Sequence, residues 1–231
     1  EHLTELSSLV QTKGAHLGIT VDPDVDRLAL VCEDGSMFGE EYTLVAVADY
    51  VLTHTPGPTV SNLSSTRALR DITEMRGLRY DAAAVGEVNV VVKMKEIGAV
   101  IGGEGNGGII YPELHYGRDS LVGIALFLSH LAHKKSSMTA LRASYPNYVI
   151  SKNKIDLDPS TNVDELLVLM AKKYETFEVD ATDGVKIYID KEWVHLRKSN
   201  TEPIIRIYAE SASEEKATAL ATRIIEEIKA F

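Results

Sequence analysis

The order of the predicted helices and strands changes near Ser144, and this change constrains the fold more than any other feature. From Glu40 to that point, helical spacing of apolar residues alternates with short apolar strands, which predicts an α/β layer with a largely parallel sheet. Beyond Ser144-Tyr145-Pro146-Asn147, predicted strands gather between two helices, a pattern typical of an antiparallel α+β domain. The chain of 231 residues is therefore predicted to hold two different domains behind a short N-terminal piece.

The apolar periodicity also predicts the bounds of each element. In the first part, helices are expected over 3–13, 42–52, 67–76, 89–97 and 119–133, and strands over 15–21, 28–32, 59–63, 82–84 and 99–102. In the second part, helices are expected over 163–174 and 214–230, and strands over 148–156, 176–181, 184–189, 193–197 and 204–209. Residues 1–36 give one helix and a strand pair, too little for a domain, and residue 1 is Glu. We therefore expect the chain to begin inside a longer protein.

The composition excludes several classes of protein. Hydrophobic residues make up 45% and charged residues 25%, the values of an ordinary soluble globular protein. The net charge of -10 argues against a non-specific nucleic-acid binder. Cys32 is the only cysteine, so no intrachain disulfide can form, which fits the cytoplasm. No apolar run approaches the roughly 18–20 residues that span a bilayer, so no membrane association is expected.

The first loop whose residues suggest a functional role is Asp22-Pro23-Asp24-Val25-Asp26-Arg27, between two predicted strands. Its three carboxylates alternate along the loop, which lets them converge on one hard divalent cation. Arg27 could hold a phosphate oxygen beside such a metal. The alternative interpretation is a solvated acidic turn, and the EF-hand template fits poorly because its Gly and distal Glu are missing.

The second loop is the glycine-rich segment 102–108, with five glycines in seven residues. Glycine is favoured where a backbone approaches something closely or takes a positive φ. Glu104 and Asn106 are the only side chains offered, and a carboxylate beside an amide suits vicinal sugar hydroxyls. A flexible hairpin turn is the alternative, and the segment lacks the context of a dinucleotide-binding fingerprint.

The third loop is Arg197-Lys198-Ser199-Asn200-Thr201-Glu202-Pro203. Arg197 offers a planar fork for phosphate, while Ser199 and Thr201 offer hydroxyl donors. Asn200 tolerates the left-handed backbone that turns N–H groups toward an anion. Arg206 follows as a second cation or as a salt-bridge partner of Glu202. The segment predicts a phosphate grip, with a polar hairpin as the alternative.

Other candidates carry weaker signals. Most histidines are expected to be structural, with His115 the least certain because it follows the glycine-rich segment. Asp119 is expected at or near the start of a helix. Arg118, directly before it, could face a substrate.

In this order, the three loops resemble those of the α-D-phosphohexomutase family, which includes phosphoglucomutase, phosphomannomutase and phosphoglucosamine mutase. The acidic loop matches the family's magnesium loop, usually D-G-D-x-D-R, with Pro23 in place of the usual Gly. Glu104 and Asn106 match its sugar-specificity loop, often G-E-x-S-G-H. Residues 197–203 match its phosphate loop, R-x-S-x-T-E-P. The resemblance covers the whole chain.

The resemblance implies a four-domain phosphomutase whose phosphorylated serine lies in the first domain and completes the magnesium site. No T-A-S-H-N-type motif occurs in this chain. The chain would then hold the end of domain 2 (1–38), domain 3 (39–145, α/β) and domain 4 (146–231, a mobile α+β lid). The fragment would bind Mg²⁺, sugar and phosphate without turning over alone, and its partners would be a hexose phosphate and the missing N-terminal domains.

The same comparison implies a role for each site residue. The metal ligands would be Asp22, Asp24 and Asp26, with Arg27 in support. The substrate ligands would be Glu104, Asn106, Arg197, Ser199, Asn200, Thr201 and Arg206.

The sequence departs from the family pattern at Gly108, where many bacterial members have a histidine that is a candidate acid/base. Glu87 and His115 are candidates for that role here. A non-catalytic sugar-phosphate-binding module of the same fold is the main alternative function. A phosphatase with a nucleophilic Asp22 is another. The sequence leaves open which hexose phosphate is used and the oligomeric state.

Overall fold

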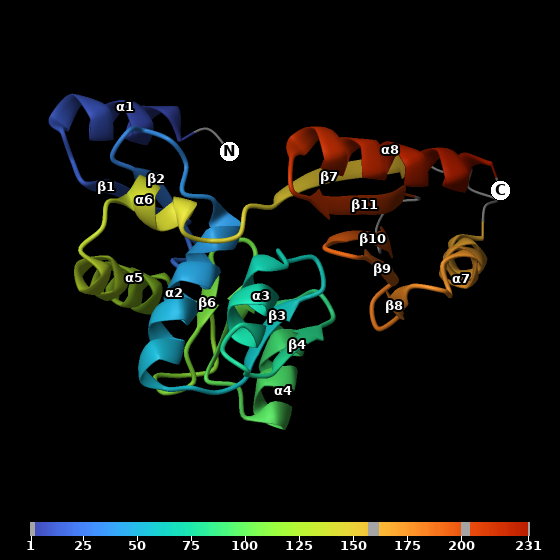
Figure 1. Ribbon diagram of the computed structural model, residues 1–231, viewed down its shortest axis with the longest axis horizontal. Helices are drawn as coiled ribbons and strands as arrows, with labels where there is room; N and C mark the ends of the chain where they lie inside the picture. Colours follow the sequence, from blue (N-terminus) through green and yellow to red (C-terminus); the bar gives the residue numbers. More distant parts are fainter. Residues whose placement is uncertain (1–2, 157–161, 200–203, 231) are drawn as a thin grey trace. The chain divides into compact units, whose positions relative to one another are not determined.

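The computed structural model describes residues 3–156, 162–199 and 204–230, and it divides into two compact units (Figure 1). Unit 1 comprises residues 1–146 and unit 2 comprises residues 147–231. Each has its own buried apolar residues, and unit 2 has a continuous core formed by one sheet and two helices. Nowhere in the described ranges does a helix combine the length and apolar character needed to cross a membrane.

Unit 1 opens with a helix and a strand pair, as the sequence predicted. The helix is α1 (Thr4–Lys13), and the strands β1 (Leu17–Val21) and β2 (Leu28–Cys32) pair antiparallel. Gly14 ends α1 in the left-handed conformation at φ 59°, which glycine adopts without strain. The acidic loop 22–27 connects the two strands, so their pairing fixes both of its ends.

The rest of unit 1 is the predicted mixed α/β domain. Its elements are α2 (Glu40–His54), β3 (Thr59–Asn62), α3 (Ala68–Glu74), β4 (Tyr80–Ala83), α4 (Glu87–Ile97), β5 (Ile101–Glu104), β6 (Gly108–Ile110), α5 (Ser120–Lys134) and α6 (Met138–Ala143). The sheet order is β4-β3-β5-β6, with the first three strands parallel and β6 antiparallel to β5. Parallel strands end at one edge, and ligands of open α/β sheets bind at that edge.

Two secondary-structure expectations for unit 1 were wrong. The glycine-rich segment is not a loop throughout, because Gly102 to Glu104 and Gly108 pair as strands on either side of a three-residue turn. The short helix α6 was not predicted at all. Ser137 caps it by accepting a bond from the N–H of Ala140 at 3.3 Å.

Unit 2 is the predicted antiparallel domain. Its elements are β7 (Val149–Asp156), α7 (Val163–Lys173), β8 (Glu178–Asp180), β9 (Val185–Ile189), β10 (Glu192–Lys198), β11 (Ile204–Ser211) and α8 (Glu214–Lys229). The sheet order is β7-β11-β10-β9-β8, with every pairing antiparallel. Alternate residues of the central strands, such as Leu196 and Ile207, pack with α7 and α8 in one core. Their neighbours along each strand therefore face the other side of the sheet.

Candidate functional site

Arg118 lies at the centre of the charged site of unit 1. Its Nη1 is 2.8 Å from Glu104 Oε2, its Nε is 3.3 Å from Glu87 Oε2, and its Nη2 contacts Asp26 Oδ2. The Arg118 side chain is only 14% exposed, so these ion pairs are partly shielded from water. Its backbone N–H also donates to Glu87 Oε1 at 2.9 Å. One guanidinium thus joins carboxylates from the acidic loop, the start of α4 and the end of β5.

Glu104 is held on its other side by the carboxyl ends of the parallel strands. Its Oε1 accepts from Asn62 Nδ2 at 2.9 Å and from the N–H of Gly86 at 3.2 Å. Asn62 ends β3, and its own Oδ1 accepts from the N–H of Ser64 at 2.9 Å. Glu104 is 4% exposed, so the predicted sugar-binding carboxylate is buried, and both of its oxygens accept hydrogen bonds within the protein. Burying a carboxylate is costly unless it is paired and hydrogen-bonded in this way.

The acidic loop is organised around Asp22. Its Oδ1 accepts from the N–H groups of Asp26 at 3.1 Å and Arg27 at 3.2 Å. Arg27 Nε is 3.6 Å from Asp22 Oδ2 and 3.8 Å from Asp26 Oδ1. Asp24 is exposed. Val25 takes a positive φ of 58°, which is strained for a β-branched residue.

The pKa values of the two inner aspartates move in opposite directions. Burial raises the pKa of Asp26, the Arg118 guanidinium opposes this, and the carboxylate of Asp22 adds to it. Desolvation also raises the pKa of Asp22, but the N–H groups of Arg27 and Asp26 outweigh it and lower that pKa. The opposed shifts mark two carboxylates that lie close to one another.

The donor chemistry of the acidic loop fits a hard divalent cation. Asp26 Oδ1 is buried and has no hydrogen-bond partner, and carboxylate oxygens are what Mg²⁺ prefers. The fit is incomplete, since across residues 3–156, 162–199 and 204–230 no three His, Cys, Asp or Glu side chains are grouped to hold a metal. Asp22 and Asp26 are the pair that could do so, with Asp24 exposed beside them.

Backbone contacts bring the acidic loop beside the glycine hairpin. The N–H of Leu28 donates to the carbonyl of Gly107 at 3.2 Å, and the N–H of Ser120 donates to that of Val25 at 3.2 Å. A Cβ at Gly107 would lie 2.0 Å from the Leu28 carbonyl oxygen, and its φ is 79°. Glycine is therefore required at 107, which explains part of the unusual composition of this segment.

Three further sequence candidates occupy the same region. Asn106 Oδ1 accepts from the N–H of Gly108 at 3.1 Å, so its side chain closes the hairpin turn. His115 Nε2 lies 3.0 Å from Asp119 Oδ2, and Asp119 Oδ1 caps α5 by accepting from the N–H of Leu121 at 2.8 Å. The predicted helix start at Asp119 is confirmed. Desolvation opposes the hydrogen bond from His115, but the bond prevails and the pKa of Asp119 is lowered.

In unit 2, Arg197 lies on the face of the sheet opposite the helices. Its Nε is 2.8 Å from Asp183 Oδ2, and the carbonyl of Asp183 lies 2.7 Å from His195 Nε2. His195 is 1% exposed, and its burial lowers its pKa to about 4, so it is neutral at pH 7.

Cations from three adjacent strands line up at Arg197. The register places Arg197 opposite Arg206 on β11, and Arg206 opposite Lys154 on β7. Directly opposed like charges destabilise a sheet unless an anion lies between them. Ser199 closes the hairpin, its N–H donating to the Ile204 carbonyl at 3.0 Å. Asn200 and Thr201 lie outside the described residues.

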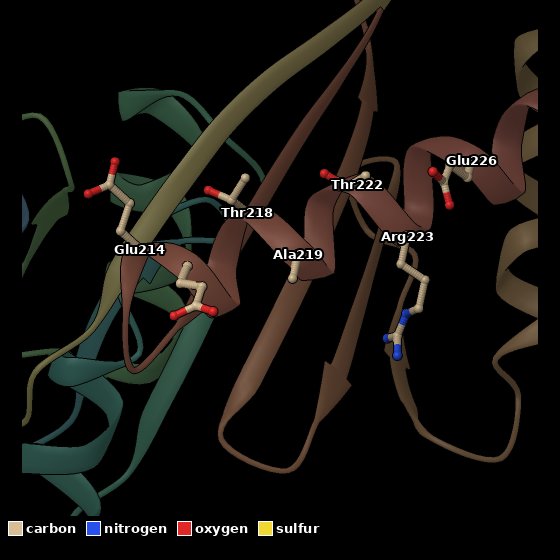
Figure 2. A pocket seen from close by; sticks show the side chains of 7 residues that line it. Glu214, Thr218, Ala219, Thr222, Arg223 and Glu226 are labelled. Carbon is tan, nitrogen blue, oxygen red and sulfur yellow. The ribbon is translucent and has the colours of Figure 1, made fainter.

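A shallow open hollow of about 700 Å³ follows α8 (Figure 2). Its lining residues all belong to α8: Glu214, Glu215, Thr218, Ala219, Thr222, Arg223 and Glu226. None of the predicted site residues lines this hollow, so it is not the candidate functional site.

The sequence did not point to Asn62, and it indicated only that Arg118 could face a substrate, whereas the structure places Arg118 at the centre of the charged cluster. Asn62 has no motif of its own, but it ends a strand of a parallel sheet, where binding residues are expected. Arg118 directly precedes Asp119, the N-cap of α5. Its carboxylate partners lie 14, 31 and 92 positions away, so spacing could not have revealed them.

Comparison with known proteins connects both units to one group. Residues 39–148 match "Phosphoglucomutase/phosphomannomutase, alpha/beta/alpha domain III", and residues 152–227 match "Phosphoglucomutase/phosphomannomutase, C-terminal domain". A phosphoglucomutase/phosphomannomutase of Thermococcus kodakarensis is 34% identical over 220 residues, covering 94% of this chain and 48% of that protein. The chain thus spans about half the length of the curated relatives it matches.

Solved structures show the same fold. A phosphoglucomutase/phosphomannomutase family protein of Burkholderia thailandensis has a TM-score of 0.84 at 24% identity, covering 99% of this chain and 49% of that one. An N-acetylphosphoglucosamine mutase of Aspergillus fumigatus, solved with GlcNAc-6P and magnesium, has a TM-score of 0.65 at 15% identity. The matched region covers 89% of this chain and 50% of the Aspergillus fumigatus chain.

Proposed function

The chain belongs to the phosphoglucomutase/phosphomannomutase family as a C-terminal portion, and we propose that it serves reversible phosphoryl transfer between C1 and C6 of a hexose phosphate. In this proposal the reaction passes through a phosphoserine and a bisphosphorylated sugar. The serine comes from the half of the protein that lies outside this chain. This chain supplies the groups that bind the cation, the sugar and the phosphate.

The observation that carries the proposal is the convergence of two predicted loops on Arg118. The acidic loop reaches it through Asp26 and the glycine hairpin reaches it through Glu104. The predicted cation ligands and the predicted sugar ligands would therefore belong to one site, at the carboxyl edge of the parallel strands. A mutase needs this proximity, because the phosphoryl group must be neutralised where the sugar is held.

Each residue has a physical task in this proposal. Asp22, Asp24 and Asp26 would hold Mg²⁺, which supplies positive charge to the transferring phosphoryl group. Glu104 and Asn106 orient the sugar ring by accepting from and donating to its hydroxyls. Such orientation is the largest contribution a protein can make to a reaction with little covalent chemistry of its own.

Unit 2 would hold the phosphate that is not being transferred. Arg197 forms charge-assisted bonds to its oxygens, and Arg206 adds a second cation from the neighbouring strand. Ser199, Asn200 and Thr201 extend this grip with hydroxyl, amide and backbone donors. Holding a spectator phosphate anchors the substrate while either end of the sugar reacts.

A mutase assay tests the proposal. The protein that contains this chain and its N-terminal half is assayed with the 1- and 6-phosphates of glucose, mannose and glucosamine, beside this chain alone. We expect interconversion of at least one pair by the longer protein and none by this chain, because the nucleophile is outside it. Mutase turnover by this chain alone would contradict the assigned division of roles. Sugar-phosphate binding without turnover by either protein would favour a non-catalytic binding module.

A further inference from the structure

Arg118 and Gly108 fit one another in a way the proposed function does not require. A Cβ built at Gly108 would lie 2.5 Å from Arg118 Cδ and 3.2 Å from Arg118 Cγ. Contacts that short cannot persist, so any side chain at 108 would push the arginine away. The backbone at Gly108 has no positive φ that demands glycine. The small residue therefore serves to admit the Arg118 side chain.

The place that Arg118 takes is next to the carboxylates a cation would use. Its Nη2 contacts Asp26 Oδ2, while Asp26 Oδ1 remains buried without a hydrogen-bond partner. Its Nη1 donates to Glu104 Oε2 at 2.8 Å, and its Nε forms an ion pair with Glu87 Oε2 at 3.3 Å without a hydrogen bond. Losing the contact to Asp26 would thus leave two carboxylates to retain the guanidinium.

We propose that Arg118 is a positioning residue that acts as the built-in counter-ion of Asp26 and releases it when a divalent cation binds the acidic loop. This inference rests on the proposed function, because it takes the acidic loop as the cation site. Arg118 holds Asp26 in place without a cation, and it keeps Glu104 oriented afterwards. Its guanidinium repels an arriving cation, so cation affinity is set lower than the carboxylates alone would give.

Titration calorimetry of Mg²⁺ into the chain tests this inference. Arg118→Gln removes the competing charge, and Gly108→Ala displaces the arginine without removing any charge. We expect each variant to bind Mg²⁺ about 10-fold more tightly than the wild type, since a unit charge a few ångströms from the cation is removed or moved away. A merely structural role predicts the opposite direction, because a loosened loop binds more weakly.

The matched control is Arg70→Gln, which removes the same charge from an exposed pair with Glu74 on α3. Its Mg²⁺ affinity should stay within about 2-fold of wild type, since salt screens distant charges. Unchanged or weaker binding by either variant, in a protein whose circular dichroism shows it folded, overturns the inference. If Arg118→Gln does not fold, Gly108→Ala decides alone. Absence of Mg²⁺ binding in the wild type overturns the cation site of the proposed function itself, and the inference with it.

Discussion

In unit 1, the shielded charges lie against opposite charges: Arg118 meets three carboxylates, and Asp49 meets Arg76. In unit 2, Arg197, Arg206 and Lys154 instead follow one another across three strands. Within the described ranges no ion pair joins Arg206 or Lys154 to an acidic side chain. The first arrangement pairs charges of opposite sign, while the second places cations opposite one another, which favours an anion between them.

The largest expected effect concerns the predicted phosphate binding by unit 2. Arg197→Ala should weaken binding of a hexose phosphate by about 2–4 kcal/mol, because charge-assisted bonds to phosphate are lost. Titration calorimetry of the longer protein measures it. Lys173→Ala, which removes a cation at the end of α7 paired with Glu227 of α8, is the control and should leave the affinity unchanged. Equal affinities for wild type and Arg197→Ala would refute the phosphate role of this strand.

The second prediction concerns the contribution of Arg118 to the stability of unit 1. Arg118→Gln leaves Asp26, Glu87 and Glu104 without their shared counter-charge, which should lower the free energy of unfolding of unit 1 by about 2–3 kcal/mol. The figure is at the low end because Asp26 and Glu87 are 21% and 34% exposed. Amide hydrogen exchange measures the free energy of unfolding of unit 1. Trp193, the only tryptophan and fully buried in unit 2, reports that unit by its fluorescence and should not change its midpoint.

A second ion cluster of unit 1 gives a pH-dependent effect. Desolvation opposes ionisation of Asp49, but its bonds to His130 and the charge of Arg76 prevail and lower its pKa to about 2 from 3.8. A lowered pKa contributes stability that is present above the unfolded value and lost as pH falls toward 2. Asp49→Asn should therefore cost about 2 kcal/mol at pH 7, with the difference from wild type vanishing near pH 2.

Urea unfolding between pH 7 and pH 2 measures this difference. Asp164→Asn is the control, because Asp164 is 70% exposed in its pair with Lys198 and should contribute little at any pH. A wild-type advantage over Asp49→Asn that stays constant down to pH 2 would show that the charge of Asp49 is not its cause.

The smallest expected effect concerns the opposed cations of unit 2, which should cost stability and favour phosphate binding. Arg206→Gln removes one of two directly opposed cations and should raise the free energy of unfolding of unit 2 by about 0.5 kcal/mol without a ligand. The same variant should lose part of its affinity for phosphate. Trp193 fluorescence during urea unfolding gives the first quantity and calorimetry gives the second. A variant that is less stable and binds phosphate normally would place Arg206 among the structural residues.

Most of the fold could be predicted because its elements carry local signals. Apolar periodicity located both sheets, and the turn at Ser144 to Asn147 lies where the chain divides into its two units. The glycine hairpin was mistaken for a loop because glycine carries no strand preference of its own. Its pairing depends on contacts with β3 and β2, which lie more than 40 positions away.

The candidate site could be predicted only where its residues form a motif. The acidic loop, Glu104 and Arg197 stood out because neighbouring residues share one chemistry. The burial of Glu104 and the central place of Arg118 could not, since both depend on which strand ends meet at the sheet edge. That meeting is a property of the fold rather than of any segment.

Nuclear magnetic resonance of the chain tests the central claim, which assigns cation binding to unit 1 and phosphate binding to unit 2. Mg²⁺ is titrated first, and inorganic phosphate is titrated into a separate sample. The account predicts that Mg²⁺ shifts the amides of Asp22, Asp26 and Arg27, and that phosphate shifts those of Arg197, Ser199 and Arg206. Mg²⁺ shifts confined to unit 2, or phosphate shifts confined to unit 1, would contradict it.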